Sequence, residues 1–178
     1  IANTLAEDLS GLRRRRMHGR AAEAIRRLRP DDFETLAHHY SESGDLKEGL
    51  AYSLKAGERA MRFSANNEAL RHYSRALEIA EAEGLTAELV PILEAIGEIQ
   101  KAGDFNRALA AYDRALRLTS RPDRQAALKA KIGTTYVMMG NEQALPMLQE
   151  AVEALDPRNQ AGDLARATAS IGRFYHNR

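Results

Sequence analysis

The sequence predicts an all-α protein made of antiparallel helix pairs, and three observations support this fold class. Helix-favouring Ala, Leu, Glu and Arg recur along the whole chain. No segment alternates apolar and polar residues as a half-buried strand would. Short turns separate the helical stretches, and such short joins force neighbouring helices to pack antiparallel.

Nine helices are expected from the hydrophobic periodicity and the turn residues between periodic stretches. The five prolines lie mostly at segment edges or in first turns, where a missing N–H costs little. The predicted helices cover residues 12–28, 32–43, 46–63, 66–83, 86–101, 104–118, 122–139, 142–155 and 161–176.

A short turn followed by a spaced set of residues recurs along the chain. The turns are Gly44-Asp45, Gly103-Asp104 and Gly140-Asn141, with Asn66-Asn67 in a similar place. After each turn, residues spaced by four and then three share one helical face. Small residues at the ends of a set let the next helix approach closely, and the middle residue fills the gap. The four sets are Gly49/Ser53/Ala56, Ala69/Tyr73/Ala76, Ala108/Tyr112/Ala115 and Ala144/Leu148/Ala151.

Glycines also stand inside predicted helices, at Gly133 and Gly172. Glycine in a helix interior costs about 1 kcal/mol relative to Ala. We therefore expect a partner helix to cross at each of these two positions. Gly97 stands one residue closer to its turn than this pattern requires.

The helix–turn–helix unit resembles the tetratricopeptide repeat family over about residues 32–178, with a period of about 36–39 residues. The clearest unit runs from Ala126 to Pro157 and contains Ile132-Gly133, Tyr136 and the Gly140-Asn141 turn. The resemblance implies a right-handed solenoid whose concave groove, lined by the first helix of each pair, binds peptides or partner proteins. The repeats are degenerate: none has the family's usual Trp, and helix 46–63 is expected to serve two neighbouring units.

The first 30 residues are strongly basic, with eight arginines against three acidic residues. The predicted helix there has an apolar face of Met17, Ala21, Ala24, Ile25 and Leu28. The basic surface is formed by Arg13, Arg16, Arg20 and Arg27. This stretch lacks aromatic residues for base stacking, so nucleic acid is not the expected partner. We expect a solvated face or a contact with an upstream domain.

The arginine-rich run also resembles the junction that follows the nucleotide-binding core of bacterial signal-transduction ATPases, among them transcription regulators and nucleotide cyclases. That resemblance implies a repeat array that senses a ligand or partner and restrains the ATPase. The predicted organisation is an N-terminal helical junction over residues 1–30 and repeats over 31–178, cut at the C-terminus. The last helix would then leave its apolar face (Leu164, Ala167, Ile171, Phe174) open to self-association or to another molecule.

No catalytic, metal or cofactor site is expected. The adjacent His38 and His39 point about 100° apart on a helix, and the chain has no cysteine. Glu94 and Glu98 share a helical face, but such spacings are common on solvated helices, and no nucleophile elbow or phosphate loop occurs. No apolar run reaches the roughly 18 residues that span a membrane, and no signal peptide is visible, which favours the cytoplasm.

The expected partner groove runs from acidic through apolar to basic side chains. A chaperone-tail clamp is set aside because His38, Glu98 and Thr134 stand where Lys and Asn would be needed. We expect a non-catalytic interaction or regulatory module of a larger bacterial signalling or transcription-regulating protein, whose partner is a protein, a peptide or another domain of the parent chain. The alternative is a sensor that binds a small inducer in the groove. The groove candidates are Glu34, His38, Glu42, Glu94, Glu98, Lys101, Thr134, Val137, Met138, Arg166, Arg173 and His176.

Overall fold

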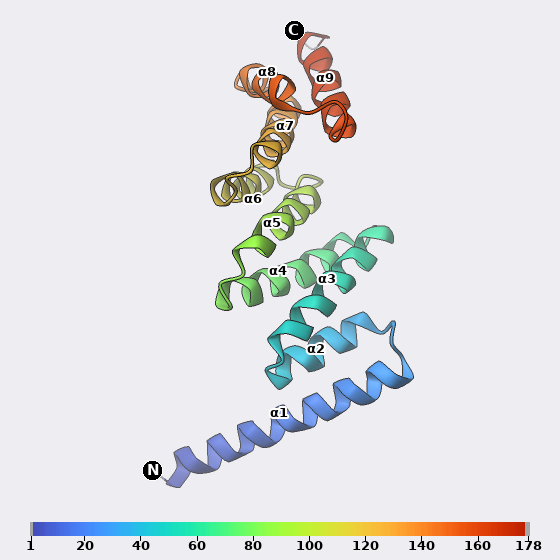
Figure 1. Ribbon diagram of the computed structural model, residues 1–178, viewed down its shortest axis with the longest axis vertical. Helices are drawn as coiled ribbons and strands as arrows, with labels where there is room; N and C mark the ends of the chain where they lie inside the picture. The colour runs from blue at the N-terminus through green and yellow to red at the C-terminus, as the bar shows by residue number, and fades with distance from the viewer. Residues whose placement is uncertain (1, 177–178) are drawn as a thin grey trace. The chain divides into compact units, whose positions relative to one another are not determined.

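The computed structural model describes residues 2–176, and over this range it contains nine α-helices and no strand (Figure 1). Consecutive helices pack against one another in pairs. The helices are α1 (Ala2–Leu28), α2 (Phe33–Ser43), α3 (Leu46–Arg62), α4 (Asn66–Ala82), α5 (Thr86–Gln100), α6 (Phe105–Leu118), α7 (Pro122–Met138), α8 (Ala144–Ala154) and α9 (Ala161–His176).

The all-α fold class and the nine helices are confirmed in the described range, with most predicted ends within two residues of those observed. The exception is α1, which begins at Ala2 rather than at residue 12. Ser10 and Gly11 do not interrupt this helix, because the Ala, Leu and Glu residues before them favour helix. Pro91 lies inside α5 rather than in its first turn.

The turn residues end one helix and begin the next. Gly44 closes α2 in the left-handed conformation (φ 86°), and the Asp45 side chain accepts a 3.2 Å hydrogen bond from the Glu48 N–H to cap α3. The Asp104 side chain caps α6 in the same way, accepting a 3.1 Å hydrogen bond from the Arg107 N–H. This chemistry explains the short joins between the helices.

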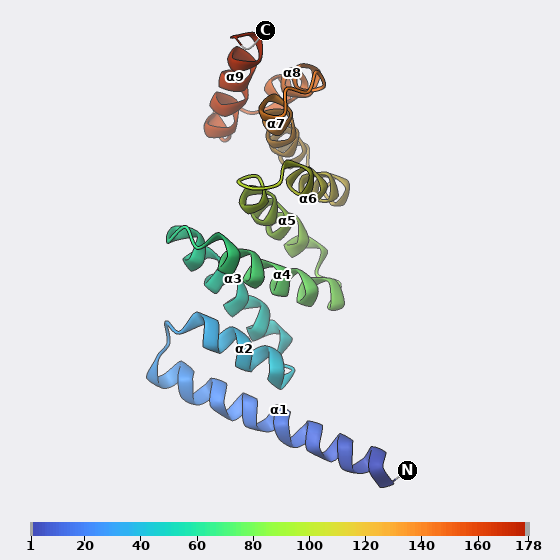
Figure 2. The same cartoon turned by 180° about the vertical axis from the view of Figure 1, so that it is seen from behind.

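The chain divides into two compact units, Ile1–Leu85 and Thr86–Arg178. In the first unit α1 packs on α2, α2 on α3, and α3 on α4. Helix α3 therefore contacts both of its neighbours, as expected for residues 46–63. In the second unit α5 pairs with α6 and α7 with α8, while α9 packs on both α7 and α8 (Figure 2).

Glycine on one helix faces the middle residue of a repeat set on its partner. A Cβ built on Gly133 would lie 2.7 Å from Leu148 Cγ, and one on Gly97 would lie 2.7 Å from Tyr112 Cδ1. Both distances are shorter than any real Cβ contact. The crossing expected at Gly133 is therefore confirmed, and Gly97 marks another.

The crossing expected at Gly172 is wrong for the described residues, because a Cβ there would meet nothing within 4 Å. Gly172 is exposed and lies one position away from the face of α9 that packs.

The apolar face of α9 is covered by its own chain. Ala167 and Phe174 are buried in a core cluster with residues of α7 and α8, including Leu148. Leu164 and Ile171 pack against the same cluster. The expectation that these four side chains would be left open is wrong, and they give no support for self-association.

None of the helices in the described part of the chain combines the length and apolar character needed to cross a membrane.

We expect Gly97→Ala to lower the free energy of unfolding by about 1–3 kcal/mol, because the new methyl would displace the Tyr112 ring or separate α5 from α6. The matched control is Gly172→Ala, where open space and the higher helix propensity of Ala predict no loss, or a gain of up to about 1 kcal/mol. Urea denaturation of both variants measures the difference. Equal effects of the two changes would contradict the close packing at Gly97.

Candidate functional site

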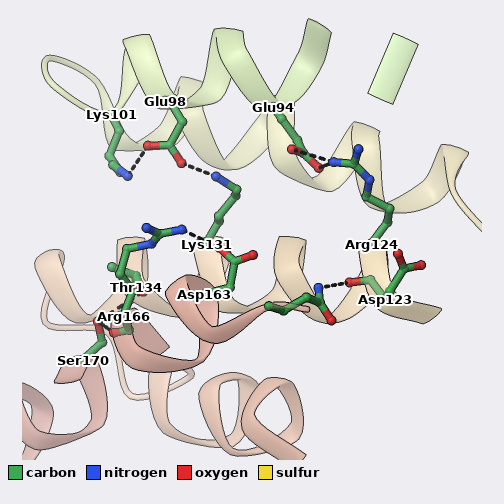
Figure 3. A network of polar contacts seen from close by, with 11 residues as sticks. Glu94, Glu98, Lys101, Asp123, Arg124, Lys131, Thr134, Asp163, Arg166 and Ser170 are labelled. Carbon is green, nitrogen blue, oxygen red and sulfur yellow. Dashed lines mark hydrogen bonds and ion pairs between the residues drawn. The ribbon is translucent and has the colours of Figure 1, made fainter. Parts of the chain in front are cut away.

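Polar side chains from three helices of the second unit gather in one cluster (Figure 3). Helix α5 contributes Glu98, and Lys101 follows directly after the end of α5; α7 contributes Lys131, and α9 contributes Asp163 and Arg166. These side chains, together with Ala130 and Thr134, line a pocket of about 270 Å³. We call these seven residues the partner groove, after the prediction from the sequence that named four of them.

Glu98 is the centre of the partner groove because it joins α5 to α7. Its Oε2 lies 2.6 Å from Lys101 Nζ, and its Oε1 lies 2.6 Å from Lys131 Nζ. Burial by itself would raise the pKa of Glu98, but the hydrogen bonds and charges of the two lysines outweigh burial and lower the pKa to about 2. The Glu98 carboxylate is therefore ionised throughout the neutral range.

Glu94 lies one turn earlier on α5 in a different environment. Its side chain is 16% exposed, and its carboxylate lies 3.4 Å from Arg124 Nη1 on α7. Burial raises the pKa of Glu94, although the charges of Arg124 and Lys131 act in the opposite direction. Both glutamates are thus engaged with cations of α7.

The α9 side of the cluster is basic and hydroxylic. Arg166 Nη2 lies 2.6 Å from Asp163 Oδ1, and Thr134 Oγ1 lies 3.2 Å from Ser170 Oγ. Arg173 donates a 2.9 Å hydrogen bond to Ser170 Oγ. Around the pocket itself, three cations face two carboxylates, which leaves one positive charge in excess.

Sequence reasoning placed Glu94, Glu98, Lys101, Thr134, Arg166 and Arg173 near this region, and the structure brings them together. It missed Arg124, Lys131, Asp163 and Ser170. Lys131 lies three residues before Thr134, and Arg124 lies seven residues before Lys131. These spacings place both on the same face of α7 as Thr134, so the helical periodicity could have identified them.

Three groove residues expected in the second unit are not part of this cluster. Val137 is only 9% exposed and lies in the core of the second unit, so its place in the groove was wrong. Met138 is 53% exposed and His176 is exposed, but neither contributes a contact to the cluster.

In the first unit, Glu34, His38 and Glu42 lie along α2 and line a second cavity of about 350 Å³ with residues of α3 and α4. These three candidates are therefore neighbours in space, as their spacing on α2 predicts.

The predicted basic surface of α1 is exposed at Arg13, Arg16, Arg20 and Arg27. The predicted apolar face, however, is wrong at both ends, since Met17 is 64% exposed and Leu28 is 80% exposed. Helix α1 instead turns Ala22 fully inward, with His18 and Ile25 partly buried. These residues are spaced by four and three, so the packed stripe is rotated by about one residue from the expected one.

Three histidines meet where α1 packs on α2. His18 Nδ1 lies 3.0 Å from His39 Nδ1, and the His18 ring also lies against His38, with 5.6 Å between ring centroids. The sequence could not place His18 here, because it lies 20 residues before His38 and on another helix. No group of three His, Cys, Asp or Glu residues among those described is arranged to hold a metal ion. Burial lowers the pKa of His39, and the neighbouring His38 and His18 lower it further.

These observations define an all-α protein of consecutively paired helices with a polar groove in its second unit. No protein-family model matches the sequence, and no curated protein matches it. Its fold is similar to that of BtubC (BKLC) from P. vanneervenii, with a TM-score of 0.59 and 19% sequence identity. The similarity covers 92% of this chain and 89% of that one, and at this identity it concerns the fold alone.

We expect Glu98→Gln to lower the free energy of unfolding at pH 7 by about 1 kcal/mol, because Lys101 and Lys131 lose the carboxylate they share. The folded-state pKa of Glu98 is below its usual value, so this stabilisation is present above pH 4.5 and is lost as the pH falls toward 2. Urea denaturation at neutral and acidic pH measures both effects. Glu88→Gln, at an exposed position of the same helix, is the control; an equal loss in both variants at pH 7 would contradict the role of Glu98.

The histidine contact predicts that the protein loses stability as the pH falls below about 6.5. The folded-state pKa of His39 is lowered, so the unfolded chain takes up the proton more readily, and protonation favours unfolding. His72, which has a lowered pKa as well, contributes with the same sign. His39→Gln should remove part of the fall, whereas His176→Gln, at an exposed position, should not. Denaturation curves at about pH 7.5 and about pH 5.5 test this, and an unchanged pH dependence in His39→Gln would contradict it.

Proposed function

We propose that the chain is a non-catalytic interaction module of a larger bacterial signalling or transcription-regulating protein in the cytoplasm. Its helix pairs form a right-handed solenoid of the tetratricopeptide type. The consecutive pairing of helices and the close crossings at Gly97 and Gly133 support this arrangement. The similarity to BtubC supports the all-helical fold that this arrangement requires.

The observation that carries the proposal is the convergence of three cations from three separate segments of the second unit. Lys101 lies directly after α5, Lys131 lies on α7 and Arg166 lies on α9, and the three line one pocket. A partner segment that carries carboxylates would meet charge-assisted hydrogen bonds there, which are about twice as strong as neutral ones. We therefore propose an extended acidic segment of a protein as the ligand of the partner groove.

The chemistry of the two glutamates agrees with a binding role rather than a catalytic one. A carboxylate with a pKa of about 2, such as Glu98, is a poor base near neutral pH. Glu94 is engaged with Arg124. Neither nucleic acid nor a membrane is part of this proposal.

Fluorescence anisotropy with short labelled peptides tests the proposal directly. We expect a Glu-rich peptide to bind, with affinity that falls as salt is raised, and a Lys-rich peptide of equal length not to bind. Arg166→Gln and Lys131→Gln should each weaken binding by about fivefold or more.

The control variant is Arg107→Gln, which removes the same charge from the exposed surface of α6 in the same unit. If the Glu-rich peptide fails to bind, or if Arg107→Gln weakens it as much as Arg166→Gln does, the partner groove is not the binding site.

A further inference from the structure

The second cavity lies in the first unit, where α2, α3 and α4 meet, and the proposed partner groove does not involve it. Its volume of about 350 Å³ is within the range of small-ligand pockets, roughly 300–1,000 Å³. Arg71 and Arg75 on α4 are exposed, whereas Ser53 on α3 and His72 on α4 are buried. The cavity thus combines accessible charges with buried polar groups.

The cavity exists because the repeat set in α3 has a small residue at its middle position. The middle residue of the set is Tyr73, Tyr112 or Leu148 in α4, α6 and α8, and each of these side chains packs tightly against a glycine of a neighbouring helix. In α3 the same position is Ser53, and the small Ala37 is among the α2 residues that line the cavity with it. Two small side chains therefore stand where a large one would otherwise fill the space.

The buried polar groups of this cavity have no partner within the described chain. Ser53 is fully buried and His72 is 8% exposed, and neither Ser53 Oγ nor His72 Nε2 has a hydrogen-bond partner among the described residues. Native proteins rarely leave buried polar groups unsatisfied, since each costs about 1–3 kcal/mol. A ligand with a polar group of its own would remove this cost.

His72 is suited to bind an uncharged polar group. Burial lowers the pKa of His72, and the nearby charge of Arg71 lowers it further, against the opposing charges of Glu34 and Glu68. The imidazole is therefore neutral at neutral pH and offers one donor and one acceptor.

The charged residues that line the cavity are balanced, and one of each sign is free. Glu42 lies 3.7 Å from Arg75, so these two charges neutralise one another. Glu34 and Arg71 line the same cavity, and neither forms an ion pair with another side chain of residues 10–176, the range over which side chains are described. The cavity therefore presents one carboxylate and one guanidinium to whatever enters it.

We propose that this cavity binds a small zwitterion, a free amino acid or a similar amino-carboxylic acid. Arg71 would bind the carboxylate of the ligand, for which the planar guanidinium can form two parallel hydrogen bonds. Glu34 would bind the ammonium group, and Ser53 and His72 would receive a polar substituent. The site does not depend on the partner groove of the second unit, so each can fail without the other.

Isothermal titration calorimetry on the whole chain tests the proposal. The probes are free L-amino acids, tested one at a time, with acetate, methylamine and glucose as compounds that carry one charge or none. We expect at least one amino acid to bind, and acetate and methylamine to bind at least about tenfold more weakly. Arg71→Gln and Glu34→Gln should each weaken the binding of the amino acid by about tenfold, and Ser53→Ala should weaken it by about fivefold.

The matched controls are Arg62→Gln and Glu58→Gln, which make the same charge changes at exposed positions of α3 and should leave the affinity unchanged. Circular dichroism establishes that each variant is folded. The proposal is overturned if no amino acid binds, if glucose binds more tightly than every amino acid, or if folded Arg71→Gln and Glu34→Gln bind as the unchanged chain does. Loss of Glu-rich peptide binding by the second unit has no bearing on this result.

Discussion

The close approach of paired helices is the constraint on which the rest of this structure depends. At Gly97 and Gly133, a glycine without a side chain receives Tyr112 or Leu148 from the partner helix. Side chains of the size found at Tyr112 would not fit against any residue larger than glycine without moving the helix. In each of these two helix pairs, the distance between the helices is therefore set by one glycine and the one side chain that it faces.

This packing also positions the polar groove. Tyr112 is fully buried against Gly97, and Lys131 Nζ lies 6.0 Å from the centre of the Tyr112 ring. Burial, together with the negative charge of Glu98, raises the pKa of the Tyr112 hydroxyl, so the ring stays neutral. Glu98 follows Gly97 directly in the sequence and binds Lys131. The core contact and the central ion pair of the groove are thus adjacent parts of the same helix crossing.

The sequence was sufficient to predict the helices, because turn residues such as Gly44-Asp45 act locally and periodicity identifies the packed stripes. It also predicted the crossing at Gly133. It failed where the answer depends on a neighbouring helix. The pairing of Glu98 with Lys131, the meeting of His18 with His39 and the covering of Ile171 all join residues far apart in the chain. The periodicity of one helix shows which residues share a face, but it does not show which other helix packs against that face.

The glycines at the crossings have a consequence for how the chain folds. A helix with glycine near its middle is a poor helix by itself, and short isolated helices are marginal in water even with good sequences. Helix α5 contains both Pro91 and Gly97, which disfavour an isolated helix. We therefore expect α5 to become helical only when it packs against α6. For α5, helix formation and docking on α6 are then one event, and the smallest piece in which α5 is expected to become ordered is the α5–α6 pair.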